Sequence, residues 1–181
     1  MKTISVAAVT AGGKTTVVGE LKKRLPNSRS LHFDDYNFGG GVEDFPEWVR
    51  NGADYQVWDL APLEEDILKA REEGDCDYLL LDYPFAYCHN AVKKYIDAAF
   101  FIDTPLDIAL ARRVLRDMGS ATAEEIRLEL ETYLEHARPA FVQMHRDILP
   151  SSDYVIDGAQ SVEKITVDIL AKLTEGGVLH D

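Results

Sequence analysis

The sequence predicts an α/β fold built on a mostly parallel sheet of about five strands with helices on both faces. Short apolar runs alternate along the chain with longer stretches of helical period. Two of these runs, Tyr78–Asp82 and Ala98–Ile102, are almost continuously apolar. Such runs are typical of strands buried on both faces of a parallel sheet, whereas half-exposed antiparallel strands alternate apolar and polar residues. Regular alternation of strands and helices indicates the α/β class.

The remaining elements follow from the same periodicity. The first strand is expected over Thr3–Val9, followed by a glycine turn and a helix to about Leu25, which Pro26 closes. A second short strand is expected over Ser30–Phe33. Apolar residues at helical spacing predict helices over Asp59–Glu73, Pro105–Met118, Ala121–Ile148 with a break near Pro139, and Ser161–Leu173, with a last strand over Tyr154–Ile156.

The composition fits one acidic domain. The chain has 181 residues, close to the size of a typical domain of roughly 150, so a single domain over residues 1–181 is expected. Acidic residues number 32 against 19 basic, and the formal charge of −13 disfavours nucleic acid and anionic membranes as partners. We see no membrane-spanning run and no leader pattern in the sequence, so we expect a cytoplasmic protein. Cys76 and Cys88 do not have the spacing of metal ligands or of a disulfide framework, so we expect both thiols to be unpaired.

The segment Ala8–Thr16 has the pattern of a phosphate-binding loop. The standard loop is G-x-x-x-x-G-K-[ST] between a strand and a helix, and here only the first glycine is changed, to Ala8. Glycines let backbone N–H groups turn inward around an anion at the positive end of a helix dipole. The nucleotide-contacting residues would be Ala11, Gly12, Gly13, Lys14, Thr15 and Thr16.

Two side chains of this loop have specific expected roles. Lys14 would reach the β- and γ-phosphates of a nucleotide, and the Thr15 hydroxyl would ligate Mg²⁺. The replacement at Ala8 is harmless if that residue has a negative φ, since only a left-handed conformation makes alanine costly. The alternative is a glycine turn that starts a helix beside an ordinary exposed lysine. The flanking strand and helix favour the nucleotide site.

Two acidic groups follow other predicted strands. Asp82 ends a buried strand, where magnesium–nucleotide sites place a carboxylate, although a turn or capping role would also suit it. Asp34 and Asp35 follow the second strand at the sheet edge where ligands of open parallel sheets bind. One of them could take a proton from an attacking hydroxyl. A simple turn explains this pair equally well on spacing alone.

The segments Gly12–Thr16 and His32–Tyr36 together resemble the uridine kinase and nicotinamide riboside kinase group of small P-loop kinases. The likeness continues over most of the chain, at Tyr55–Asp59, Ala111–Asp117, Pro139–Phe141 and Asp153–Ile156. The resemblance implies a three-layer P-loop NTPase fold with a helical lid at about residues 112–120. It also implies a phosphotransferase that moves the γ-phosphoryl group of ATP, with Mg²⁺, to an alcohol group of a nucleoside or similar small metabolite.

The same resemblance assigns roles to individual residues. Asp34 would be the base, with Asp35 and Tyr36 beside the acceptor or metal. Trp58 would stack on a planar group and Asp59 would bind ribose hydroxyls. Arg112 and Arg116, four residues apart on one helix face, would neutralise charge on the transferred group, while Arg113 points elsewhere.

Simpler interpretations stay open at this point. Trp58 and Trp48 could be ordinary core or rim aromatics, and the lid arginines could only balance an acidic surface. A regulatory P-loop protein without phosphotransfer, or an adenylate-kinase-like enzyme, are the alternative functions. An adenylate-kinase-like enzyme would need basic residues near its acceptor to bind the acceptor's phosphate. Residues 36–58 contain one basic residue, Arg50, which favours an uncharged acceptor. The acceptor's identity and the oligomeric state stay open.

Overall fold

The centre of the computed structural model, which describes residues 1–179, is a five-stranded sheet in the order β2-β5-β1-β6-β7. Its strands are β1 (Lys2–Ala7), β2 (Ser28–His32), β5 (Tyr78–Asp82), β6 (Ala98–Asp103) and β7 (Tyr154–Asp157). All neighbouring strands pair in parallel. This confirms the predicted α/β class and parallel sheet. The last two residues of the predicted range 1–181 lie outside the described part of the chain.

Strand register decides which side chains meet at the carboxyl edge of the sheet. Val6 of β1 is level with Asp82 on one side and with Phe100 on the other. His32, the last residue of β2, is in turn level with Asp82. The loop that leaves β1 therefore emerges beside Asp82, at the edge where ligands of open parallel sheets bind.

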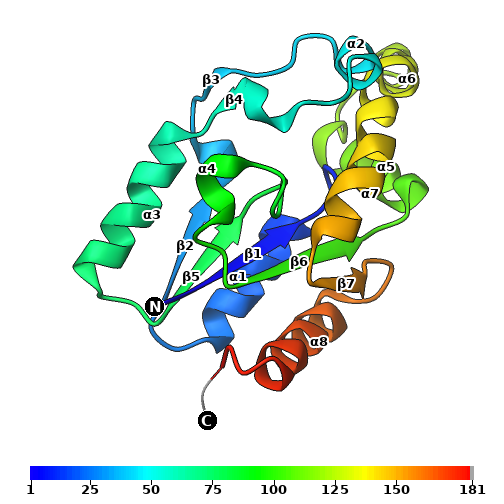
Figure 1. Ribbon diagram of the computed structural model, residues 1–181. Helices are drawn as coiled ribbons and strands as arrows, with labels where there is room; N and C mark the ends of the chain where they lie inside the picture. Colours follow the sequence, from blue (N-terminus) through cyan, green and yellow to red (C-terminus); the bar gives the residue numbers. More distant parts are fainter. Residues whose placement is uncertain (180–181) are drawn as a thin grey trace.

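Helices cover both faces of the sheet, so that the fold has three layers (Figure 1). On one face, α1 (Lys14–Arg24) and α8 (Val162–Glu175) pack against side chains that include Leu80 and Phe100. On the other face lie α3 (Ala61–Glu73), α4 (Asn90–Lys93) and α7 (Arg138–Ser151). Successive residues of a strand point to opposite faces, which is why continuously apolar strands supply both cores.

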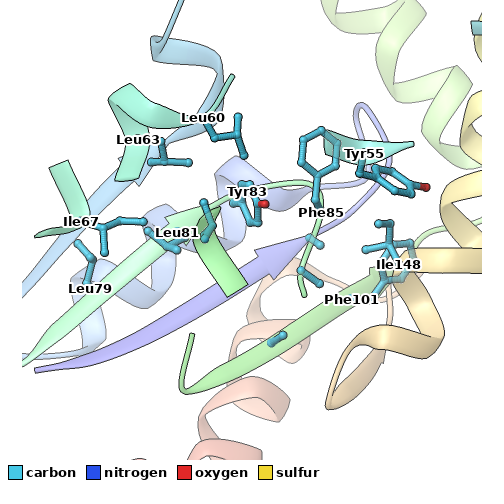
Figure 2. Close-up of a cluster of buried hydrophobic side chains, with 14 of the residues drawn as sticks. Tyr55, Leu60, Leu63, Ile67, Leu79, Leu81, Tyr83, Phe85, Phe101 and Ile148 are labelled. Carbon is cyan, nitrogen blue, oxygen red and sulfur yellow. The ribbon is translucent and has the colours of Figure 1, made fainter. Parts of the chain in front are cut away.

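The core of the second face is the larger of the two (Figure 2). Leu63 and Ile67, four residues apart on α3, lie beside Leu79 and Leu81 of β5. This cluster continues past the end of β5 to Phe85 and its aromatic neighbours. The same apolar cluster thus runs from under α3 to the carboxyl edge of the sheet.

Short elements were not anticipated from the sequence. A two-stranded antiparallel pair, β3 (Gly39–Gly40) with β4 (Trp58–Asp59), frames the helix α2 (Phe45–Arg50). Elements of this length carry too few residues for a periodic pattern to emerge. The 3₁₀ turns η1 (Phe33–Asp35) and η2 (Tyr55–Val57) flank this region. The expected strand Ser30–Phe33 accordingly ends at His32.

The helix expected to break near Pro139 is widened instead. After α5 (Leu106–Asp117), the chain forms α6 (Ala123–Thr132), the π-helical segment η3 (Tyr133–Ala137) and then α7. The N–H of Arg138 bonds to the carbonyl of Tyr133, five residues back. Pro139 has no N–H and its ring clashes with an ordinary helical carbonyl, and the wider turn just before it keeps the helical path continuous.

Over residues 1–179, no helix is long and apolar enough to cross a membrane. Cys76 is buried, Cys88 is half-buried, and both are free thiols.

Gly158 lies in close contact with Thr104 and provides a test of the packing. A Cβ on Gly158 would lie 2.0 Å from Thr104 Oγ1 and 2.7 Å from the Thr104 backbone nitrogen. We expect Gly158→Ala to lower the free energy of unfolding by about 1–3 kcal/mol or more, as overpacking does. Gly19→Ala in α1 is the matched control, since its Cβ would meet nothing within 4 Å. It should instead stabilise by about 0.5–1 kcal/mol, and equal urea midpoints for the two variants would contradict the packing argument.

Candidate active site

A cavity of about 630 Å³ opens at the carboxyl edge of the sheet. This volume lies within the roughly 300–1,000 Å³ of ligand pockets. The predicted site residues that line it are Ala11, Gly13, Lys14, Thr15, Thr16, Asp34, Trp58, Arg112 and Arg116. They come from the loop after β1, from the first turn of α1, from η1, from β4 and from α5. Segments far apart in the sequence therefore meet at one cavity.

The loop between β1 and α1 has the backbone of an anion cradle. Gly13 has φ 101° and Ala11 has φ 59°, and left-handed residues within a turn direct successive N–H groups into a concavity that suits anions. A left-handed alanine costs of order 1–3 kcal/mol, and strain of this kind clusters at functional sites. Ala8 is absent from the residues with positive φ. The missing first glycine therefore introduces no backbone strain.

The floor of this loop is closely packed. A Cβ on Gly12 would lie 2.8 Å from Ala8 Cβ and 2.8 Å from the Val9 carbonyl oxygen. The Gly12 N–H donates to that carbonyl at 2.9 Å. The methyl group of Ala8 thus contacts the loop without preventing it from closing, but only glycine fits at position 12.

Thr104, which the sequence reasoning missed, anchors the loop from below. This residue follows β6, is fully buried, and donates from Oγ1 to the Gly12 carbonyl at 2.8 Å. Thr104 also presses against Gly158, whose carbonyl accepts two hydrogen bonds from Arg112 at 3.3 Å. The only sequence signal was a hydroxyl directly after a buried strand, on the same edge of the sheet as the glycine loop.

Lys14 and Asp82 form a buried ion pair behind the cavity surface. The Asp82 side chain is only 2% exposed, and its second oxygen lies 2.9 Å from His32 Nδ1. Burial alone would raise the pKa of Asp82, but Lys14 and the hydrogen bonds from Thr15 and His32 outweigh it and lower that pKa. Asp82 is therefore ionised and holds the lysine at the mouth of the loop.

The residues around Asp82 also fit a magnesium ion. The Asp82 carboxylate and the Thr15 hydroxyl are hard oxygen donors of the kind that Mg²⁺ takes, usually with substrate phosphates completing the shell. Across the described residues, no group of three or more His, Cys, Asp or Glu side chains could hold a metal by itself. Asp82 and Thr15 therefore fit a magnesium ion whose remaining ligands would come from a bound phosphate.

The two acidic residues of η1 diverge. Both side chains are exposed, but Asp34 lines the cavity and Asp35 does not. A 3₁₀ turn has three residues per turn, so two successive side chains cannot face the same way. Asp35 is not among the residues that line the cavity, and its expected place beside the acceptor or metal stays a prediction.

Two further expected acceptor contacts point elsewhere. The Tyr36 hydroxyl donates to Asp66 of α3 at 2.7 Å. Asp59 is exposed, and its carboxylate accepts from the Ala61 N–H at the start of α3 at 3.1 Å. It lines a separate hollow of about 490 Å³ rather than the main cavity. Trp58 lines this hollow as well as the main cavity, so the two residues share only the smaller space, and their expected roles on one ligand stay a prediction.

The lid arginines separate as the helical spacing suggested. Arg112 and Arg116 line the cavity, and Arg113 instead pairs with Glu129 at 2.7 Å. The pKa of Arg116 is raised, chiefly by its hydrogen bonds to Asp117 and in smaller part by Asp34.

Aromatic side chains form the wall of the cavity beyond Asp34. Trp58 lies 4.8 Å from Phe85 and 5.8 Å from Trp48 between ring centroids. Trp48 is 9% exposed and belongs to the core, while Trp58 is half-buried at the cavity surface. Trp48 is thus mainly a core aromatic, and Trp58 has a position from which it can meet a ligand.

Comparison with known proteins places the chain near one group of enzymes. It is 27% identical to uridine-cytidine kinase B of Dictyostelium discoideum over 95% of this chain and 82% of that protein. The chain resembles the uridine kinases. It is also 25% identical to the chloroplastic uridine/cytidine kinase of Arabidopsis thaliana over 93% of this chain, but it spans only 40% of that protein's length. No protein-family model matches the chain.

A solved structure supports the fold independently of sequence. The shikimate kinase of Bacteroides thetaiotaomicron superposes with a TM-score of 0.58 at 10% identity, covering 96% of this chain and 98% of that one. The layers, the parallel sheet and this neighbour confirm the expected three-layer P-loop NTPase fold, and the expected resemblance to uridine kinases is confirmed as well.

Thr104 provides a test of how the loop is held. We expect Thr104→Val to lower the free energy of unfolding by about 1–3 kcal/mol, because the buried Gly12 carbonyl loses its donor. Nucleotide affinity should fall with it, since the loop is no longer pinned. Thr104→Ser keeps the hydroxyl and should retain most of the affinity. Equal nucleotide affinities of the two variants, measured by calorimetric titration, would exclude the anchoring role.

Proposed function

We propose that the chain is an ATP-dependent kinase that transfers the γ-phosphoryl group to a hydroxyl of a nucleoside or a similar small metabolite. The observation that carries the proposal is the convergence of Lys14, Asp34 and the two lid arginines on one cavity. These are a phosphate-binding cation, an acid at the acceptor side and a charge-neutralising pair. The similarity to uridine kinases supports this reaction.

The donor phosphates would bind at the loop before α1. Backbone N–H groups that point inward and the start of a helix favour an anion there. The Lys14 ammonium is held beside the loop by its ion pair with Asp82. Because these contacts are local, the net charge of −13 does not prevent a phosphate from binding. Thr15 and Asp82 would hold Mg²⁺, which neutralises phosphate charge when bound.

Asp34 would act on the acceptor. An ionised carboxylate can orient the acceptor hydroxyl and receive its proton as the oxygen attacks phosphorus. Arg112 and Arg116 would offset negative charge on the transferred group, a contribution worth about 10³–10⁵ in rate where an arginine is well placed. We place the lid at about residues 112–120, the end of α5 and the turn after it.

The alternative functions have less support. The regulatory interpretation depended on Ala8 and on the unusual sequence around Asp82, and of these Ala8 introduces no left-handed strain in the loop. An adenylate-kinase-like enzyme would need basic side chains on the acceptor side of the cavity to bind the acceptor's phosphate. The side chains that line the cavity past Asp34 are aromatic.

An acceptor panel tests the proposal. We expect ADP release from ATP to depend on adding a nucleoside or related alcohol, with little release in its absence. Binding of ATP without acceptor-dependent turnover, across nucleosides and ring-bearing alcohols, would instead favour the regulatory protein.

Neighbouring acids provide a sharper test of the base. Asp34→Asn should lower kcat by about 10²–10⁴-fold, the contribution of a positioned general base, and leave ATP affinity nearly unchanged. Asp35→Asn, a matched change one residue along and outside the cavity, should alter kcat far less. If kcat falls with Asp35→Asn and not with Asp34→Asn, the assignment of the base is wrong.

A further inference from the structure

His32 is a polar residue at the carboxyl edge of the sheet that the proposed transfer does not use. It is the last residue of β2 and lies level with Asp82, the last residue of β5. Its Nδ1 is 2.9 Å from Asp82 Oδ2, whereas Lys14 donates to the other carboxylate oxygen, Oδ1. The two oxygens of this buried carboxylate therefore have separate partners, one on β2 and one at the start of α1.

The contacts of His32 decide which ring nitrogen carries the hydrogen. Asp82 is ionised and can only accept, so Nδ1 donates to it. Nε2 lies 3.1 Å from Ser30 Oγ and, in the neutral ring, accepts the hydrogen of that hydroxyl. Ser30 Oγ accepts in turn from Lys22 Nζ of α1 at 3.4 Å. The hydrogen bonds thus run in one direction, from Lys22 through Ser30 and His32 to Asp82.

The support behind the imidazole is part of the sheet itself. Ser30 precedes His32 by two residues, and because side chains alternate along a strand, both lie on the same face of β2. The strand is paired with β5 from Ser28 to His32. The ring can therefore turn away from Asp82 only by breaking a hydrogen bond at each of its two nitrogens.

Lys14 has a second expected partner, because it would also reach the β- and γ-phosphates of a bound nucleotide. A lysine shared with phosphate holds Asp82 less firmly, and a buried carboxylate that loses its partner is strongly destabilised. His32 is absent from the residues that line the cavity, so a nucleotide does not compete for it. Its bond to Oδ2 can persist and keep Oδ1 directed toward the start of α1.

We infer that His32 is a positioning residue for the expected magnesium site: it holds Asp82 Oδ2 and so presents Oδ1 to Lys14 and to the metal. This inference rests on the proposed function, since it needs a nucleotide with Mg²⁺ at the loop. A side chain that orients a metal-binding group from outside the ligand shell is typically worth about 10–100-fold in metal affinity or activity.

Two substitutions of nearly equal shape separate the hydrogen bond from the packing of the ring. The amide of His32→Asn retains an N–H donor close to Cβ, and His32→Leu has the same branched shape without one. We expect His32→Leu to weaken binding of a nonhydrolysable ATP analogue in Mg²⁺ by about 10–100-fold, measured by calorimetric titration. In EDTA the loss should be much smaller, because Asp82 would act on the phosphates through the metal. His32→Asn should restore most of the affinity in Mg²⁺.

Ser30→Ala tests the same role without touching the contact between His32 and Asp82. It leaves Nε2 without its hydroxyl partner, and we expect the affinity in Mg²⁺ to fall by up to about tenfold, the worth of one neutral hydrogen bond. If urea unfolding shows that His32→Leu does not fold, Ser30→Ala decides: a loss confined to Mg²⁺ supports the inference, and no loss overturns it.

The other outcomes are equally distinct. Equal losses for His32→Leu in Mg²⁺ and in EDTA, or the same affinity for His32→Leu and His32→Asn, would leave His32 a structural role only and overturn the inference. If the unmodified protein binds the analogue no better in Mg²⁺ than in EDTA, the expected magnesium site and the proposed kinase function fail together.

Discussion

The hydrogen bond from Thr104 to the Gly12 carbonyl is the contact on which the candidate site depends. It connects the residue after β6 to the loop after β1, and β1 is the central strand of the sheet with β6 as its neighbour. Thr104 also contacts Gly158, whose carbonyl accepts hydrogen bonds from Arg112, so Thr104 links the glycine loop after β1 to α5. Only glycine fits at positions 12 and 158 because the backbones approach so closely there.

Local arrangement overrides the overall charge at this site. A protein with a formal charge of −13 can bind an anion because backbone dipoles and one lysine act over short distances, while surface charges are screened beyond about 10 Å. The acid nearest to the loop strengthens this arrangement: Asp82 is buried and ionised, and it keeps the Lys14 ammonium in place. The excess of acidic residues therefore does not by itself exclude a small phosphate ligand.

Much of the fold was predictable, and the limits have physical causes. Buried parallel strands and the glycine loop have local signals, so β5, β6 and the position of Lys14 follow from sequence alone. The orientations of Asp35 and Asp59 do not, because a single residue's shift along a 3₁₀ turn or a strand reverses which side it faces. Thr104 meets Gly12 across a sheet, 92 positions away in sequence, and no local pattern encodes such a contact. Pro139 predicted a break in the helix, whereas the structure continues through it by way of the π-helical segment η3.

Three aromatic side chains of the cavity, Trp48, Tyr55 and Phe85, are also part of the hydrophobic core under α3 and α7. Truncating a buried aromatic residue removes about 3–5 kcal/mol, out of a total stability of roughly 5–15 kcal/mol. Single substitutions of these three aromatic residues are therefore constrained by their cost in stability. Divergence of acceptor preference would have to begin at the half-buried rim, with Phe141 and Met144 on α7, where a lineage can accumulate changes without risking the fold.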